Sequence, residues 1–176
     1  MTSMGKLTAL GAALAFVTAV PMAPATAQEG EYTAEALADR AQIEDLLTRY
    51  YNHFGGGIQS RIAEFYAPDG EMILGERSYK GIEAITGAYA AISSDAPQRK
   101  SYALNILISN LLIKVNGNTA TARFVFTETI VDKEGDTPRI LIQGREFDHL
   151  VKRDGRWLIS KRQIIGPKGV PEGWVD

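Results

Sequence analysis

Two acidic residues stand two positions apart in a segment whose composition predicts a β-strand. Glu146, Asp148 and Leu150 have equal parity in the run from Arg139 to Val151, so they share one face of that strand. If the face that carries Leu150 points inward, both carboxylates enter an apolar interior, where burial costs several kcal/mol unless they are paired or neutralised. Burial also raises the pKa of a carboxyl group, which suits a general acid or base. We therefore take Glu146 and Asp148 as candidate catalytic residues.

The arginines in the same part of the chain allow other interpretations. Arg123, Arg145 or Arg162 could neutralise the acids in a plain ion pair, or the two acids could face solvent. Each arginine could instead stabilise a developing oxyanion, and we take Arg123 and Arg162 as candidate substrate-binding residues. If the other parity of the strand, with Arg145, Phe147 and His149, faced inward, every one of these assignments would change.

Aromatic residues near position 50 form a second group of candidates. Tyr50 and Phe54 continue the helical spacing of the aliphatic residues before them, which places both on the apolar face of a helix. The Tyr50 hydroxyl could bind a carbonyl or phenol of a substrate, or it could reach water or backbone at the edge of an ordinary core. We take Tyr50 as a candidate catalytic residue. Phe54, and Tyr51 at the edge of the same face, are candidate substrate-binding residues.

The two histidines do not form a metal motif. His53 and His149 lie far apart in the sequence, and no helical pair or carboxylate spacing completes a ligand set. His53 is a candidate substrate-binding residue at a cavity mouth, although a solvated histidine favoured by a helix C-terminus is the simpler interpretation. His149 has the opposite parity to Asp148 and is expected at an interface. The chain has no cysteine, and we expect neither a metal nor a cofactor.

These candidates must be positioned by helices in the first half of the chain. Helical spacing predicts segments over about 39–54, 58–66 and 82–92. Asp39 and Gln42 have the form of a capping box at the start of the first segment, and a start near Thr33 is the alternative. The glycines at 55–57 end that helix, because glycine adopts the left-handed exit conformation cheaply. They lack the setting of a nucleotide-binding fingerprint.

The second half of the chain changes to the pattern of strands. Turn residues at 116–118 and the Asp154-Gly155 pair separate runs rich in β-branched and aliphatic residues. Helices followed by sequential antiparallel strands predict an α+β domain with the helices on one face of the sheet. The predicted strands are a short one over 71–74 and four longer ones over 101–115, 119–131, 139–151 and 157–165.

The N-terminal segment and the net charge of the chain indicate where the protein acts and which partners it does not have. Lys6, the apolar run 7–20 and the small residues before Gln28 have the form of a cleaved secretory signal over residues 1–27. Residues 28–176 then make a single domain, which we expect in a bacterial periplasm and free of the membrane after cleavage. A net charge of −2 with interspersed signs does not form a basic nucleic-acid footprint. The tail from residue 166 is expected to be loosely held.

The order of several short motifs resembles the SnoaL-like branch of the NTF2-like superfamily. Each motif is weak alone, and together they span nearly the whole of residues 28–176. The matching segments are Ile43–Tyr50, Phe65–Gly70, Lys80–Ile85, Ser109–Asn110, Val115–Ala120 and Asp148–Ile159.

This resemblance implies an NTF2-like cone: three N-terminal helices packed on a strongly curved, mainly antiparallel sheet with a four-strand meander. It also implies an apolar cavity, no cofactor, and a homodimer formed through the sheet. Dehydratase and cyclase members use an Asp after the first helix and a His on the first long strand. Here Gly55 stands at the first position and Asn105 or Ile106 at the second. Asn105 can orient a substrate but cannot transfer a proton at neutral pH. It is our last candidate catalytic residue.

We predict a secreted, cofactor-independent lyase, dehydratase or isomerase for a small hydrophobic, aromatic or phenolic compound. In this hypothesis Glu146 or Asp148 moves the proton while Tyr50 and Asn105 orient the substrate. The missing Asp–His pair keeps a non-enzymatic periplasmic binder of apolar molecules as the alternative. A dimerisation module with a vestigial cavity is a third interpretation, which an open pocket of several hundred Å³ would argue against.

Overall fold

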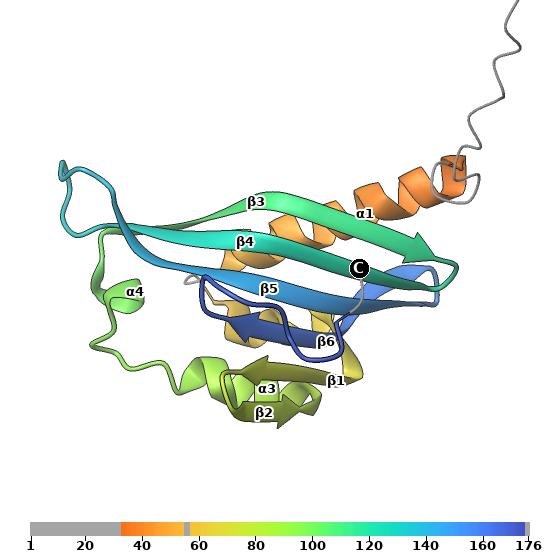
Figure 1. Ribbon diagram of the computed structural model, residues 1–176. Coiled ribbons are helices and arrows are strands. Elements are labelled where there is room, and N and C mark those ends of the chain that lie inside the picture. Colours follow the sequence, from red (N-terminus) through yellow and green to blue (C-terminus); the bar gives the residue numbers. More distant parts are fainter. Residues whose placement is uncertain (1–32, 55–56, 175–176) are drawn as a thin grey trace, which may run out of the picture.

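A six-stranded curved sheet forms the frame of the molecule (Figure 1). The computed structural model describes residues 33–54 and 57–174. β3 to β6 form the predicted antiparallel meander, and β1 joins it parallel to β6. Across the sheet the order is β2 (Arg77–Lys80), β1 (Tyr66–Leu74), β6 (Arg156–Ile165), β5 (Arg139–Arg153), β4 (Thr119–Val131) and β3 (Ala103–Asn116).

Helices cover the concave side of this sheet, as the α+β prediction requires. α1 (Ala34–His53) packs against β3 and β6, and α3 (Gly81–Ala90) packs against β1 and β2 (Figure 1). Three short helical segments complete the set: η1 (Ile58–Arg61), α2 (Ile62–Phe65) and α4 (Pro97–Lys100). No helix in the described ranges combines the length and apolar character needed to cross a bilayer.

The boundaries differ from the prediction mainly where the chain changes from helix to sheet. β1 begins at Tyr66, not at residue 71, and its pairing with β6 shifts between Tyr66 and Glu71. The Pro68-Asp69-Gly70 segment, which reads as a turn, is thus absorbed into an irregular strand. β2 was not predicted from the sequence, and neither was α4, which lies between the predicted helix over 82–92 and the predicted strand over 101–115. The predicted secretory signal and Gly55 lie outside the described residues.

The helix α1 starts at the alternative site, so the capping box at Asp39 is wrong. Thr33 is the N-cap, and its hydroxyl accepts a hydrogen bond from the Ala36 backbone N–H. Asp39 instead lies inside the helix, 3% exposed, because β5 and β6 supply it with partners. Its Oδ1 accepts from Lys152 Nζ at 2.8 Å and from Trp157 Nε1 at 3.0 Å. In the sequence, an acid that precedes an apolar helical run looks the same whether it caps the helix or lies inside it and faces the core.

We expect Asp39→Ala to lower the free energy of unfolding by about 2–3 kcal/mol, because it leaves a buried indole N–H and an ammonium without their acceptor. Burial acts to raise the Asp39 pKa, but the bonds from Lys152 and Trp157 outweigh it and lower that pKa below 3.8. The stabilisation is therefore present above pH about 4 and is lost as pH falls through the folded pKa. Urea denaturation at pH 7 and pH 3 measures both effects.

Asp45→Ala is the matched control in the same helix. Asp45 pairs with Arg49 at 2.8 Å, but both side chains are largely exposed. Its loss is expected to cost less than about 0.5 kcal/mol. Equal effects of the two variants would contradict the importance of the Asp39 network.

The tail is not loosely held throughout, contrary to expectation. Trp174 packs on the outer face of the sheet, with ring centroids 5.0 Å from Phe147 and 5.1 Å from His149. Phe147 is buried by this contact although its parity points away from the helices. The Arg145 guanidinium also donates to the Gly169 carbonyl.

Candidate active site

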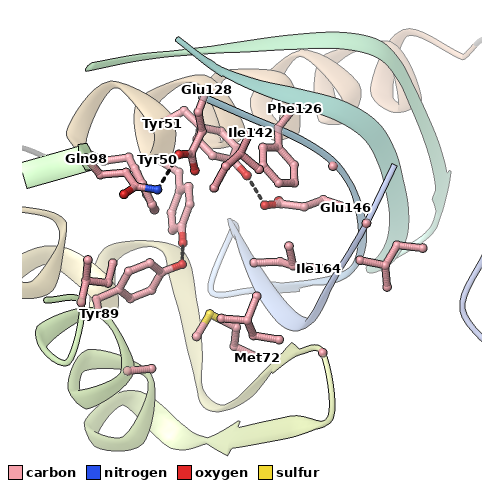
Figure 2. Close-up of a pocket in the computed structure, with 18 of the residues that line it drawn as sticks. Tyr50, Tyr51, Met72, Tyr89, Gln98, Phe126, Glu128, Ile142, Glu146 and Ile164 are labelled. Carbon is pink, nitrogen blue, oxygen red and sulfur yellow. Dashed lines mark hydrogen bonds between the residues drawn. The ribbon is translucent and has the colours of Figure 1, made fainter. Parts of the chain in front are cut away.

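An open cavity of about 480 Å³ lies between the sheet and the helices (Figure 2). Side chains of α1, β1, α3, β4, β5 and β6 contribute to its wall, which is predominantly apolar. A volume of this size accommodates a small organic molecule, and it argues against the interpretation of a vestigial, filled cavity. The polar side chains among its lining residues are Tyr50, Tyr51, Tyr79, Tyr89, Gln98, Glu128, Gln143 and Glu146.

The parity of β5 places the two acids on the concave side of the sheet. Glu146 is 3% exposed and Asp148 is fully buried. Only Glu146 lines the cavity, and the Tyr51 hydroxyl donates to its Oε1 (Figure 2). Its Oε2 lies 3.1 Å from Arg162 Nε. The acid is thus held in place by one neutral donor and one cation.

Burial raises the pKa of Glu146 to about 7. The loss of hydration outweighs the opposing charge of Arg162, and the nearby Asp148 carboxylate raises the pKa further. The Tyr51 hydrogen bond acts in the opposite direction. A carboxyl group that titrates near neutral pH can either accept or deliver a proton in the same cavity.

Arg162 lies behind Glu146 and is fully buried. Its Nε and Nη2 donate to the two oxygens of Asp148 at 2.9 and 2.7 Å, in a bidentate pair. The guanidinium also stacks 4.2 Å from the centroid of the Tyr50 ring. Neither Arg162 nor Asp148 lines the cavity. The ion-pair interpretation that the sequence left open therefore holds for Asp148, and Arg162 positions Glu146 instead of contacting a ligand.

Tyr50 and Tyr89 present a hydroxyl pair to the cavity (Figure 2). Burial raises the pKa of Tyr50, and the Arg162 charge only partly offsets it. Burial raises the pKa of Tyr89 still further. Both groups are consequently neutral phenols at physiological pH; one hydroxyl donates to the other, and the second proton is left to donate to a carbonyl or phenol oxygen. The sequence did not single out Tyr89 as a site residue, because α3 shows only an apolar stripe in which a tyrosine resembles a core residue.

Glu128 is a second cavity acid that the sequence reasoning missed. It lies on β4, 7% exposed, and its Oε2 accepts from Gln98 Nε2 at 3.0 Å (Figure 2). Burial raises its pKa, and the Gln98 hydrogen bond opposes that shift. The signal was present, because Glu128 continues the inward parity of Phe124, Phe126 and Ile130 on one strand.

Comparison with known families decides the assignment of the fold. A model of the SnoaL-like domain matches residues 35–163. The chain belongs to the SnoaL-like domain family. No curated protein matches the chain.

Solved structures share the fold of this SnoaL-like domain at low sequence identity. An NTF2-like protein with a cystatin-like fold from Novosphingobium aromaticivorans is 21% identical with a TM-score of 0.66, covering 77% of this chain and 86% of its own. A candidate scytalone dehydratase from the same organism is 21% identical with a TM-score of 0.60, over 80% and 97% of the two chains. ActVI-ORFA from Streptomyces coelicolor is 16% identical with a TM-score of 0.65, over 74% and 98%.

Three sequence candidates lie away from the cavity of this SnoaL-like domain. Asn105 is exposed on the outer face of β3, whereas the next residue, Ile106, packs against the core. Arg123 has the outward parity of β4 and pairs with Phe147 across the sheet. His53 lies beside Arg61, whose Nη1 is 3.0 Å from its Nδ1. The strand or helix that carries each of these side chains directs it away from the cavity. On a strand, a shift of one residue is enough to move a side chain to the opposite face.

Four of the sequence candidates line the cavity, whereas Asp148 and Arg162 lie behind it. Tyr50, Tyr51, Phe54 and Glu146 all contribute to its wall. Within residues 33–54 and 57–174, no cluster of three or more His, Asp or Glu side chains is arranged to hold a metal ion. The side chains able to move protons in the cavity are thus carboxyl and phenol groups.

Proposed function

We propose that this SnoaL-like domain catalyses a cofactor-independent elimination or isomerisation of a small hydrophobic, aromatic or phenolic compound. The observation that carries the proposal is Glu146, a cavity-lining carboxyl group whose pKa burial raises to about 7. An apolar cavity of about 480 Å³ around it supports a substrate of this class.

In the proposed mechanism Glu146 takes a proton from a carbon next to a carbonyl group and returns it to the departing hydroxyl or to another carbon. The Tyr50–Tyr89 pair donates a hydrogen bond to the carbonyl or phenol oxygen on which negative charge develops. Tyr51 and Arg162 hold the Glu146 carboxyl in place. Proton transfer by a positioned group accelerates a reaction by about 10²–10⁴-fold. Orientation of the substrate in a cavity with little water increases the rate further.

Hydrogen exchange provides a test that needs no knowledge of the natural substrate. The protein is incubated in D₂O with a panel of aromatic hydroxy ketones, and mass spectrometry follows deuterium uptake and loss of water. We expect catalysed exchange whose rate changes around pH 7, rising with pH where Glu146 acts as the base. If neither exchange nor product forms with any compound, and the compounds bind, the proposal of catalysis fails.

A non-enzymatic binder is the second candidate. The observation in its favour is that neither histidine lines the cavity, and Ile106 occupies the inward position on β3. In that case the same panel gives tight binding and no product. The secretory signal and the homodimer stay predictions from the sequence, which N-terminal sequencing of the exported protein and sedimentation would test.

A further inference from the structure

The cavity has an unbalanced set of charges. Two acids, Glu128 and Glu146, line it, whereas none of the described lining residues is Lys, Arg or His. Arg162 is already bound to Asp148 and lies behind Glu146. Arg99 lies near the mouth, where its guanidinium donates to the Tyr89 backbone carbonyl, but it is exposed to solvent and does not line the cavity. An anionic ligand would therefore meet carboxylates in a poorly solvated space, with no facing cation to compensate it.

Glu128 is only partly satisfied by the protein. Among the described residues, its hydrogen-bond partner is Gln98, which donates to Oε2 at 3.0 Å. Because a carboxylate only accepts, the Gln98 amide nitrogen must face it, and the amide oxygen is left as an acceptor. Glu128 Oε1 and this amide oxygen are both acceptors to which a ligand could donate a hydrogen bond. A hydroxyl or an ammonium group has that chemistry.

The register of the sheet separates Glu128 from Glu146. Glu128 pairs with Ile142 on β5, four residues before Glu146 on the same strand. At the rise of an extended strand, that separation corresponds to about 13 Å between backbone positions along β5, while the two carboxyl groups are near enough for Glu128 to raise the Glu146 pKa. A bicyclic aromatic molecule is long enough to extend from one acid toward the other, so the two groups can contact opposite ends of one ligand.

We propose that Glu128, held by Gln98, binds a hydroxyl or amino group at the end of the ligand remote from Glu146, so that the cavity selects neutral or cationic aromatic molecules and rejects carboxylates. This inference rests on the proposed function for the location of the substrate, but it concerns binding selectivity and not catalysis. Glu128 is a specificity-determining residue in this scheme.

Three probes that share one ring system separate the charges. Naphthol, naphthylmethylamine and naphthoate are titrated into the full chain at pH 7 by calorimetry. We expect naphthol and naphthylmethylamine to bind at least tenfold more tightly than naphthoate. In Glu128→Gln, the ratio of amine to carboxylate affinity should fall by about 10- to 100-fold, since hydrogen bonds to a charged group are the stronger ones.

Two further variants make the result specific. Glu44→Gln makes the same charge change on the exposed side of α1 and should leave the ratio unchanged. Gln98→Glu changes a partly exposed side chain and adds a carboxylate beside Glu128. It should raise the ratio of amine to carboxylate affinity at least threefold. This variant keeps the test valid if Glu128→Gln does not fold. Naphthoate binding as tightly as the others, or a ratio insensitive to Glu128 and Gln98, would overturn the proposal. Loss of turnover in Glu146→Gln with an unchanged ratio of amine to carboxylate affinity would show that catalysis and binding selectivity depend on different residues.

Discussion

Turnover of a responsive substrate is expected to fall by about 10²–10⁴-fold when Glu146 is replaced by Gln, the usual contribution of a positioned proton carrier. The amide keeps the size of the carboxyl group and can still accept the Tyr51 hydrogen bond, but it cannot titrate. The change near pH 7 in the pH–rate profile should disappear with it. Steady-state rates from pH 5 to pH 9 on the wild type and the variant measure both effects.

The stability of the same variant separates a catalytic role from damage to the fold. The folded-state pKa of Glu146 is raised to about 7 from 4.5, so the folded state binds an extra proton between these values. Wild-type stability from this group therefore falls as pH rises through that window. Glu146→Gln mimics the protonated form, and we expect it to be more stable than wild type by about 1–3 kcal/mol at pH 8.

Glu44→Gln on the exposed side of α1 is the control for both measurements and should match the wild type. Unchanged turnover in Glu146→Gln would remove the proposed mechanism. A Glu146→Gln protein that is inactive because it is unfolded at pH 8 would contradict the electrostatic account of the site.

Asp148→Ala is expected to lower the free energy of unfolding by about 3–5 kcal/mol, because it leaves the Arg162 guanidinium buried without its bidentate partner. Both side chains are fully buried, so water cannot replace the lost contacts. The substitution also removes a negative charge that raises the Glu146 pKa. The rise in rate with pH that this pKa controls should therefore move to lower pH. Urea denaturation and the pH profile report these two consequences separately.

The chain contains a well-matched control for this pair. Arg139 and Asp132 form a similar two-bond contact at 2.6 and 2.9 Å, but each side chain is 50% exposed. Asp132→Ala should cost less than about 1 kcal/mol. The double variant Asp148→Leu/Arg162→Met should recover most of the lost stability, because it also removes the unpaired buried charge of the Arg162 guanidinium. An equal cost for Asp148→Ala and Asp132→Ala would show that burial is not what makes the pair important.

Strand periodicity predicted that Glu146, Asp148 and Leu150 share one face of β5, but the sequence left open whether that face points inward. Leu150 could be buried only if Glu146 and Asp148 were turned the same way. The helix face with Tyr50 and Phe54 followed from the same kind of constraint, at a helical period. In both cases a local geometric rule connects neighbouring side chains, so one apolar residue determines the direction of the others.

Contacts between distant segments decided the roles that those side chains have. Asp148 and Arg162 lie on neighbouring strands, and only their register makes them a bidentate pair that leaves Glu146 as the cavity acid. Asp39 reads as a helix cap until β5 and β6 bring Lys152 and Trp157 to it.

The sequence by itself determined the α+β class, the meander and the placement of the two acids on one common face of β5, and the structure showed that this face is the concave one. The tertiary structure decided that Glu146 titrates in the cavity, that Asp148 is neutralised behind it, and that Glu128 joins the site while Asn105 does not. The physical reason is that periodicity fixes which way a side chain points, whereas its hydration and its charged neighbours depend on residues that are remote in the chain.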